Sequence, residues 1–325
     1  MTDALRTPST PARGTGSSSG PTAGTATPGP GAKGPTDAPV AGTPRRQSVL
    51  GALVSTPQGV IGSVLVALVV GAAVLGPLLA PHGFAETNFA HPFQVPRTVG
   101  YPLGTDDLGR DILSRLLHGV RASMIVGLLT IVLAVGIGTP LGLLAGYWRP
   151  ADLVVSRLTD VALAFPFLVL AVGLTAIAGA SLTNAALALG IANIPTMVRV
   201  VRGETLRLRE TEFVKAAIAT DASAPRILGL HILPGAVSAI IVQATVIMPV
   251  AVIGEATLSF LGLGIQPPSP SLGIMLSDAQ QYIYRSSSAA IFPGLAIVLI
   301  CLAFNIFGDA LRDAFDPSVT KGSRR

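Results

Sequence analysis

Long runs without a charged residue constrain this chain more than any other feature of its sequence. The first of them, from Gln58 to Pro81, is long enough to cross roughly 30 Å of hydrocarbon as a helix. Only 12% of the residues are charged, whereas 50% are hydrophobic, and soluble domains usually carry about 25% charged residues. A water-soluble core rarely needs such long apolar runs. We therefore expect an all-α integral membrane protein.

Six transmembrane helices are expected in total. The five that follow the first run cover about residues 122–146, 153–178, 185–198, 236–254 and 289–308. The third and fourth come from one uncharged stretch that is too long for a single span and is divided by small and polar residues around Gly179 to Asn184. Prolines inside spans, among them Pro166 and Pro249, are expected to be tolerated, because neighbouring helices satisfy the freed carbonyl groups.

A polar segment between the first two spans is expected to carry a short amphipathic helix. Thr105 or Asp106 can cap it, because their side-chain oxygens accept hydrogen bonds from free backbone N–H groups. Apolar residues then share one face at helical spacing: Leu108, Ile112, Leu113, Leu116 and Leu117. A helix this short should lie in the membrane interface rather than cross the bilayer.

The ends of the chain and its basic residues predict the topology. Residues 1–50 are dominated by Pro, Gly, Ser, Thr and Ala, and they cannot bury enough apolar surface to become ordered. We expect a disordered cytoplasmic tail there and a second cytoplasmic tail over 311–325. Lys and Arg are in excess in the segments that lie inside when the N-terminus is cytoplasmic. Both termini of this multi-pass cell-membrane protein are therefore expected in the cytoplasm.

Side chains that could carry chemistry are few. The net charge of +5 does not indicate nucleic-acid binding, because the basic residues lie between apolar runs and form no patch with aromatics. Asp106, Asp107 and Asp111 are explained by helix capping more simply than by a cation site. Glu255, at the end of the fifth span, faces a substrate path or has a structural role, and we expect the latter. We predict no cofactor, no metal and no catalytic residue, and no nucleotide-binding loop is recognisable.

The most informative segment is the long charged loop between the fourth and fifth spans. Helical stretches are expected around Glu204 to Thr220 and from Arg226 to Leu233, with a break between them and Pro234 at the end. An ordered loop on the inner face is either a docking site for a partner or a solvated connector. Composition alone does not decide between these two interpretations.

This loop resembles the EAA loop in the permease subunits of bacterial ABC importers. It reads KAAIATDAS and then RILGLHILP. The matching residues are Ala216, Ala217, Ile227, His231, Leu233 and Pro234. Lys215 and Asp221 stand where the family pattern has Glu and Gly. The Gly allows a left-handed turn, and Asp tolerates that conformation better than most residues, so we expect the turn at Asp221. Together with Glu212, these residues form the predicted ATPase-coupling loop.

Further strings narrow the resemblance to the C-type permease of dipeptide and oligopeptide importers. They are PLGTDDLGRDILSRLLHGVRASMIVG, LAFPFLVLAVG, VRGETLRLRETEFV, GEATLSFLGLGIQPPSPSLGIML and FPGLAIVLICLAFNIFGDALRDAFDP, and they span about residues 102–317. The resemblance implies a type I ABC importer transmembrane domain. The first transmembrane helix and an extracytoplasmic amphipathic segment would occupy 51–118, and the permease domain 119–310.

The resemblance also implies partners and a mechanism. A homologous second permease, two cytoplasmic ABC ATPase subunits and an extracytoplasmic solute-binding protein would complete the transporter within membrane lipid. The segment from about Asp221 to Pro234 would insert into a groove of the ATPase and switch the pathway between inward-open and outward-open states. Dipeptides, oligopeptides, nickel chelates and other small solutes stay open as substrates. A secondary transporter would need intramembrane charges and a repeat of spans, and the sequence indicates neither.

Overall fold

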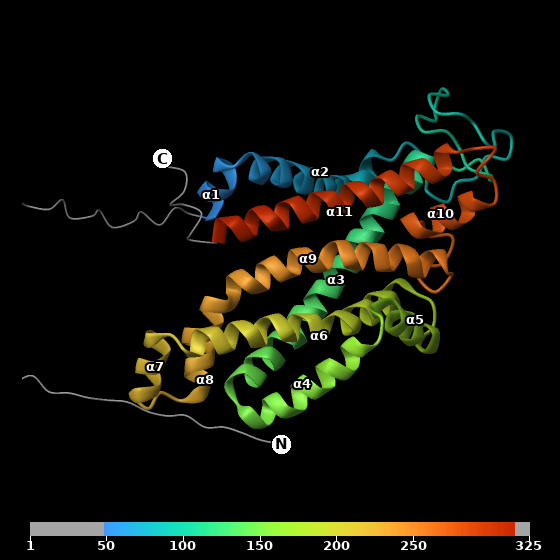
Figure 1. Cartoon of the computed structure of the whole chain (residues 1–325). Helices are drawn as coiled ribbons and strands as arrows, with labels where there is room; N and C mark the ends of the chain where they lie inside the picture. The colour runs from blue at the N-terminus through green and yellow to red at the C-terminus, as the bar shows by residue number, and fades with distance from the viewer. Residues whose placement is uncertain (1–48, 316–325) are drawn as a thin grey trace, which may run out of the picture. The chain divides into compact units, whose positions relative to one another are not determined.

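Helices form the framework of residues 49–315, the part of the chain that the computed structural model describes (Figure 1). Within these residues, five helices are long and apolar enough to cross a membrane, and a sharply bent pair makes a sixth span if it crosses as a unit. The five are α2 (Pro57–Leu79), α3 (Ile112–Tyr147), α6 (Leu182–Arg209), α9 (Leu233–Phe260) and α11 (Ser288–Phe315), and the bent pair is α4 (Arg149–Ala164) and α5 (Phe167–Ala178). The predicted all-α membrane fold is confirmed.

Short helices mark the two ends of this bundle. They are α1 (Val49–Ser55), α7 (Glu212–Ala219), α8 (Ala224–Ile227) and α10 (Leu272–Gln280). We call the end with α1, α7 and α8 the α7 end, and the end with α10 and the loop before α3 the α10 end (Figure 1). The predicted tail over 1–50 lies outside the described residues except for Val49 and Leu50, which belong to α1. The tail predicted over 311–325 lies outside them from residue 316 onward.

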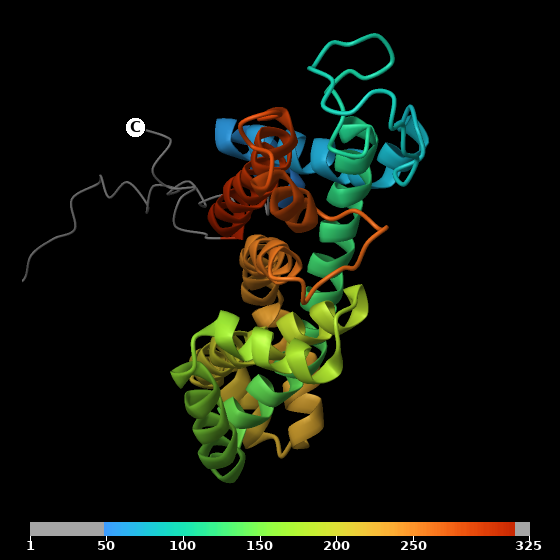
Figure 2. The same cartoon turned by 90° about the vertical axis from the view of Figure 1, so that its right-hand side faces the viewer.

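α9 lies between two groups of helices. α2 and α11 pack together on one side of it and α6 packs on the other, as both views show (Figures 1 and 2). α3 contacts both groups, because it packs against α2, α6 and α9. One apolar cluster joins α3, α6 and α9 at the α7 end, and a second joins α2, α3, α9 and α11. The position of α9 therefore couples the two halves of the bundle.

Glycines at four-residue spacing bring α3 and α6 into close contact. Gly138, Gly142 and Gly146 share one face of α3. A Cβ added at Gly142 would lie 2.7 Å from the Cβ of Val201 on α6, and one added at Gly146 would lie 2.5 Å from the Cβ of Thr205. Small residues allow such close packing in a membrane, where van der Waals contact rather than the hydrophobic effect holds helices together.

The predicted third span is not one helix. α4 ends at Ala164, α5 begins at Phe167, and the two helices are bent by 91° relative to each other. Pro166 stands at the break, because proline lacks an N–H group and disfavours the helical conformation in the residue before it. Pro166 thus divides the predicted third span into two helices, whereas Pro249 lies inside α9.

The separate amphipathic helix predicted before the second span is also wrong. α3 begins at Ile112 and runs to Tyr147, so the predicted interface helix and the second span are one element. Its cap is Asp111, whose carboxylate accepts hydrogen bonds from two backbone N–H groups of the first turn. Thr105 and Asp106 lie in the preceding loop, and Asp106 accepts hydrogen bonds from two arginine side chains. Capping by an aspartate is confirmed for Asp111.

Candidate functional site

Two short helices and a tight turn form the loop between α6 and α9 at the α7 end. The helix–break–helix pattern predicted for this loop is confirmed by α7 and α8. The first helical stretch predicted here belongs to two elements, because α6 continues to Arg209 and α7 begins at Glu212. The fourth span is therefore longer than predicted, and α6 carries the loop directly.

The turn after α7 is a Schellman motif with aspartate in the position that usually holds glycine. Asp221 has a φ of 55°, which is in the left-handed region that non-glycine residues rarely occupy. Its N–H donates to the carbonyl of Ile218 (3.0 Å), and the N–H of Ala222 donates to the carbonyl of Ala217 (3.2 Å). These two bonds are the 5→2 and 6→1 bonds of the motif. The left-handed turn predicted at Asp221 is confirmed.

Buried side chains hold the loop against the rest of the chain. Val214 of α7, Ile227 of α8 and Ile232 are almost fully buried and belong to the apolar cluster that joins α3, α6 and α9. Ala217 packs against the same cluster. Ala217 therefore faces the core of its own chain, and a bulky charge at this position would first disturb the packing of the loop.

Other residues of the loop expose large apolar side chains. Phe213 is 51% exposed, Ile218 43% and Leu230 64%. Phe213 and Ile218 lie in α7, which is too short to span a bilayer, whereas Leu230 lies at the start of the apolar helical segment Ala224–Phe260. Exposed apolar groups that lie among polar residues are typical of contact sites for proteins or membranes. The sequence analysis did not single them out, although large apolar residues in a charged loop are a usable signal.

Lys215, which stands where the family pattern has Glu, forms an ion pair within the chain. Its Nζ lies 3.0 Å from Oε2 of Glu210. The hydrogen bond from Lys215 lowers the pKa of the Glu210 carboxyl. Both side chains are exposed to solvent, where such pairs contribute little to stability. Lys215 therefore remains accessible at the surface of the loop.

Pro234 begins a helix instead of ending one. It lies in the first turn of α9, and a turn of π-helix at Leu228–Ile232 joins α8 to it. The π turn fits this place, because Pro234 has no N–H for the carbonyl four residues earlier and the hydrogen-bond pattern must shift. Ala224–Phe260 is thus a continuous helical segment of 37 residues. The prediction that a short helix ends at Pro234 is wrong, and the second half of the loop is the beginning of a membrane helix.

The nine predicted coupling residues lie together in this loop, but on different faces of it. Glu212, Lys215, Ala216, Asp221 and Pro234 are exposed, Ala217, His231 and Leu233 are partly buried, and Ile227 is buried. Among residues 49–315, no three His, Cys, Asp or Glu side chains are grouped so that they could hold a metal ion. What the loop offers is a contact surface on a rigid support.

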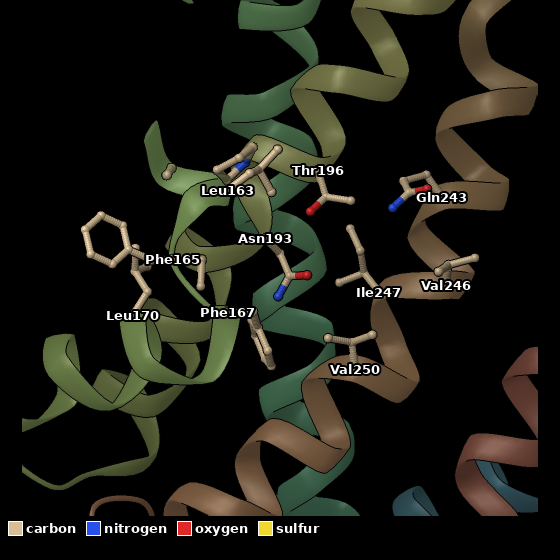
Figure 3. A pocket seen from close by; sticks show the side chains of 13 residues that line it. Leu163, Phe165, Phe167, Leu170, Asn193, Thr196, Gln243, Val246, Ile247 and Val250 are labelled. Carbon is tan, nitrogen blue, oxygen red and sulfur yellow. The ribbon is translucent and has the colours of Figure 1, made fainter. Parts of the chain in front are cut away.

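A cavity of about 200 Å³ lies among α4, α5, α6 and α9. Phe165 and Phe167, on either side of the break between α4 and α5, both line it. Its 13 lining residues include three polar ones, Asn193, Thr196 and Gln243. Figure 3 shows these three side chains directed into the space between α6 and α9. The sequence analysis identified no lining residue of a pathway, because residues from four helices come together here.

Glu255 is fully buried in α9. The hydroxyl of Ser123 on α3 donates to its Oε2 (2.6 Å), and the hydroxyl of Ser259 donates to its Oε1 (2.8 Å). The Ser259 oxygen in turn accepts the backbone N–H of Ile265 in the loop after α9 (3.2 Å). Of the two roles considered for Glu255, these contacts support the structural one, in which the carboxylate joins α9 to α3 at the α10 end.

Comparison with known proteins agrees with this architecture. A model of the family described as binding-protein-dependent transport system inner membrane component matches residues 138–321. The chain is 42% identical over 90% of its length to the dipeptide transport system permease protein DppC of Alkalihalophilus pseudofirmus, 96% of which is covered. It is 46% identical over 67% of its length to the glutathione transport system permease protein GsiD of Pectobacterium atrosepticum, 72% of which is covered. The di/tripeptide transport system permease protein DppC of Pseudomonas aeruginosa is 39% identical over 81% of this chain and 89% of its own length.

Proposed function

This chain belongs to the family of binding-protein-dependent transport system inner membrane components, and on that basis we propose that it forms half of the membrane pathway of an ATP-driven importer of short peptides. It is a permease subunit, and in such systems ATP hydrolysis takes place on separate subunits. The relatives are named for transport of dipeptides, of di- and tripeptides, and of glutathione. Glutathione is itself a tripeptide, so a short peptide is the solute that these names have in common.

The partners follow from this function. A transport-system permease works with other components of its transporter. We assign it a homologous second permease as the other half of the pathway, two cytoplasmic ABC ATPase subunits, and an extracytoplasmic solute-binding protein that delivers the peptide. Membrane lipid surrounds the apolar faces of the long helices.

Orientation and domain limits are part of the same proposal. The excess of basic residues at the α7 end supports a cytoplasmic position for this end and for both termini. We divide the chain into a tail over 1–50, a first helix with an extracytoplasmic segment over 51–118, a permease domain over 119–310 and a tail over 311–325. The boundary at 118 falls inside α3, so it divides the proposed extracytoplasmic segment from the permease domain without dividing the chain into separately folded units.

The loop with α7 and α8 is the coupling element in this proposal. The observation that supports it is the exposure of three large apolar side chains, Phe213, Ile218 and Leu230, on a segment that the buried residues Val214, Ile227 and Ile232 fix to the rest of the chain. An ATPase subunit covers these exposed side chains, and its ATP-driven movement displaces the loop. Since α8 continues into α9, the displacement is carried along one helix. Gln243 in the cavity wall lies 19 residues from Ala224, about 28 Å at 1.5 Å per residue.

Transport by the complete complex tests this function. The isolated chain is expected to hydrolyse no ATP, whereas the chain co-expressed with its second permease, ATPases and binding protein is expected to take up labelled peptides in an ATP-dependent way. Reporter fusions at the C-terminus and near Pro268 test the orientation, which requires a cytoplasmic and an extracytoplasmic signal, respectively. ATP hydrolysis by the pure chain, or a complete complex that moves no peptide, contradicts the proposal.

A further inference from the structure

We propose that the cavity among α4, α5, α6 and α9 is a peptide-binding site within the membrane pathway, in which Asn193, Thr196 and Gln243 hydrogen-bond the amide groups of the peptide. This inference rests on the proposed function and adds to it the residues that contact the solute. Four independent features of the cavity support it: its backbone, its polar groups, its walls and the ion pair beside it.

The backbone at the cavity is irregular where a membrane helix should be regular. α4 and α5 stop and restart around Pro166 with a bend of 91°, and the last carbonyl groups of a helix have no partner within it. Non-helical backbone at membrane depth is tolerated only where it is buried in protein or lines a water-filled space. Phe165 and Phe167 line the cavity from both sides of the break, so this break belongs to a path that admits water and polar solutes.

The polar side chains of the cavity have hydrogen-bonding capacity left over. Asn193 uses its Nδ2 to donate to the carbonyl of Leu189 (2.8 Å), which leaves its Oδ1 free to accept. Within residues 49–315, neither the hydroxyl of Thr196 nor the amide of Gln243 has a hydrogen-bond partner. Figure 3 shows Thr196 on α6 and Gln243 on α9 facing the same space from opposite sides. Neutral donors and acceptors on two sides match the N–H and C=O groups of a peptide bond.

The walls of the cavity suit a solute with variable side chains. Apart from the three polar residues, the lining is apolar and includes Phe167, Leu170 and Ile247. A space of about 200 Å³ greatly exceeds the roughly 10–15 Å³ that one water molecule needs. Apolar walls contact side chains without selecting a charge or a shape, whereas the few polar groups orient the backbone. This division favours recognition of the peptide bond itself.

An ion pair lies one helical turn from the cavity toward the α7 end. Arg199 follows Thr196 by three residues on α6, and Asp160 precedes the lining residue Leu163 by three on α4, so each shares a helix face with a lining residue. Arg199 Nη2 lies 3.5 Å from Asp160 Oδ1, and both side chains are 62% exposed. The pair lies toward the α7 end, which the proposed orientation places at the cytoplasmic side of the membrane, so both groups lie near the aqueous mouth of the pathway. The two groups are suited to contact the carboxylate and ammonium ends of a zwitterionic peptide.

Uptake by the complete complex in proteoliposomes tests the polar contacts, with labelled dialanine and trialanine as probes. Thr196→Val and Gln243→Met each remove a polar group at nearly constant volume. Each is expected to lower the peptides moved per ATP hydrolysed roughly five-fold, the effect of one neutral hydrogen bond, with ATPase association unchanged. Thr245→Val is the matched control, because Thr245 also lies on α9 but faces Gly308 of α11. If the wild type takes up peptide and both variants do so equally well, the inference is wrong but the proposed function stands. Absence of uptake by the wild type overturns the proposed function and the inference with it.

Cysteine labelling tests whether a peptide occupies the cavity. Cys301 is the only cysteine of the chain, so a Cys301→Ala background carrying Thr196→Cys reports on one position. A water-soluble thiol reagent is expected to label it in the complex, and dialanine delivered by the binding protein is expected to slow the labelling. Labelling only by a membrane-soluble reagent, as for a lipid-filled groove, contradicts the inference, and so does labelling at a rate that the peptide does not change.

Discussion

The turn at Asp221 gives the most direct test of the coupling loop, because its backbone conformation excludes particular residues. At a φ of 55°, Asp221→Gly removes the left-handed strain but adds chain entropy to the unfolded state, so the two effects nearly cancel within about 1 kcal/mol. Asp221→Val introduces a β-branched residue there and costs about 1–2 kcal/mol. Asp221→Pro cannot reach a positive φ and removes the N–H that donates to Ile218. The turn must then break, at a cost of roughly 3 kcal/mol or more, which is about a 100-fold loss of the docking conformation.

The assay expresses each variant with its partners, adjusts membranes to equal amounts of the chain, and measures ATPase co-purification and peptide uptake. The expected order of activity is wild type and Asp221→Gly together, then Asp221→Val, and then Asp221→Pro near zero. Asp221→Asn is the control, because Asn tolerates the left-handed region as Asp does but carries no charge. Full ATPase association and full uptake by Asp221→Pro would refute the role of this loop in coupling.

Three further predictions concern packing and docking. Gly142→Ala is expected to lower the thermal stability and membrane yield of the chain, because its Cβ would meet α6, whereas Gly136→Ala, with open space around it, should change neither. Glu255→Leu is expected to destabilise the chain by roughly 1–3 kcal/mol for each serine hydroxyl left unpaired, measured as a lower melting temperature in detergent. Ala216→Arg, at an exposed position, should abolish ATPase co-purification without loss of stability. Ala217→Arg, at a position packed against the core, should lower both ATPase co-purification and thermal stability. Equal losses of stability in the two variants would contradict the assignment of Ala216 to the surface and Ala217 to the core.

The long spans were predictable because each is a local property of the sequence. The first run was expected over Gln58 to Pro81, and α2 covers Pro57–Leu79. The position of a bend, by contrast, depends on contacts with residues that are distant in the sequence. Hydropathy on both sides of Pro166 is high, and whether a proline kinks a helix or divides it depends on whether neighbouring residues satisfy the freed backbone groups. Dependence on distant contacts also explains why the continuous helix α3 was predicted as two elements. The sequence does not show that Asp106 binds arginine side chains in the loop and that Asp111 caps the helix.

The coupling loop was predictable in its backbone but not in its surface. Asp tolerates the left-handed conformation better than most residues, so a left-handed turn was predicted at Asp221, and the observed φ agrees with this prediction. The exposure of Phe213, Ile218 and Leu230 depends on which sides of α7 and of the segment before α9 the core covers. Glu255 is a similar case, because its partner Ser123 lies 132 residues away in the sequence. No local pattern relates two such positions.

Irregular backbone links the coupling loop to the cavity. The left-handed turn at Asp221 and the π turn at Leu228–Ile232 precede α9, and the break at Pro166 lies between Phe165 and Phe167, which line the cavity together with residues of α9. The far end of α9 is held by Glu255, which lies 12 residues from Gln243 and 31 from Ala224. These separations are about 18 Å and 46 Å along a helix. A tilt of α9 about Glu255 therefore moves the cavity wall at Gln243 at most about two-fifths as far as the loop, and less if α9 bends at Pro249. In the proposed mechanism, an ATPase movement of several ångströms at the loop becomes an ångström-scale change at Gln243, which is enough to make or break a hydrogen bond to a peptide.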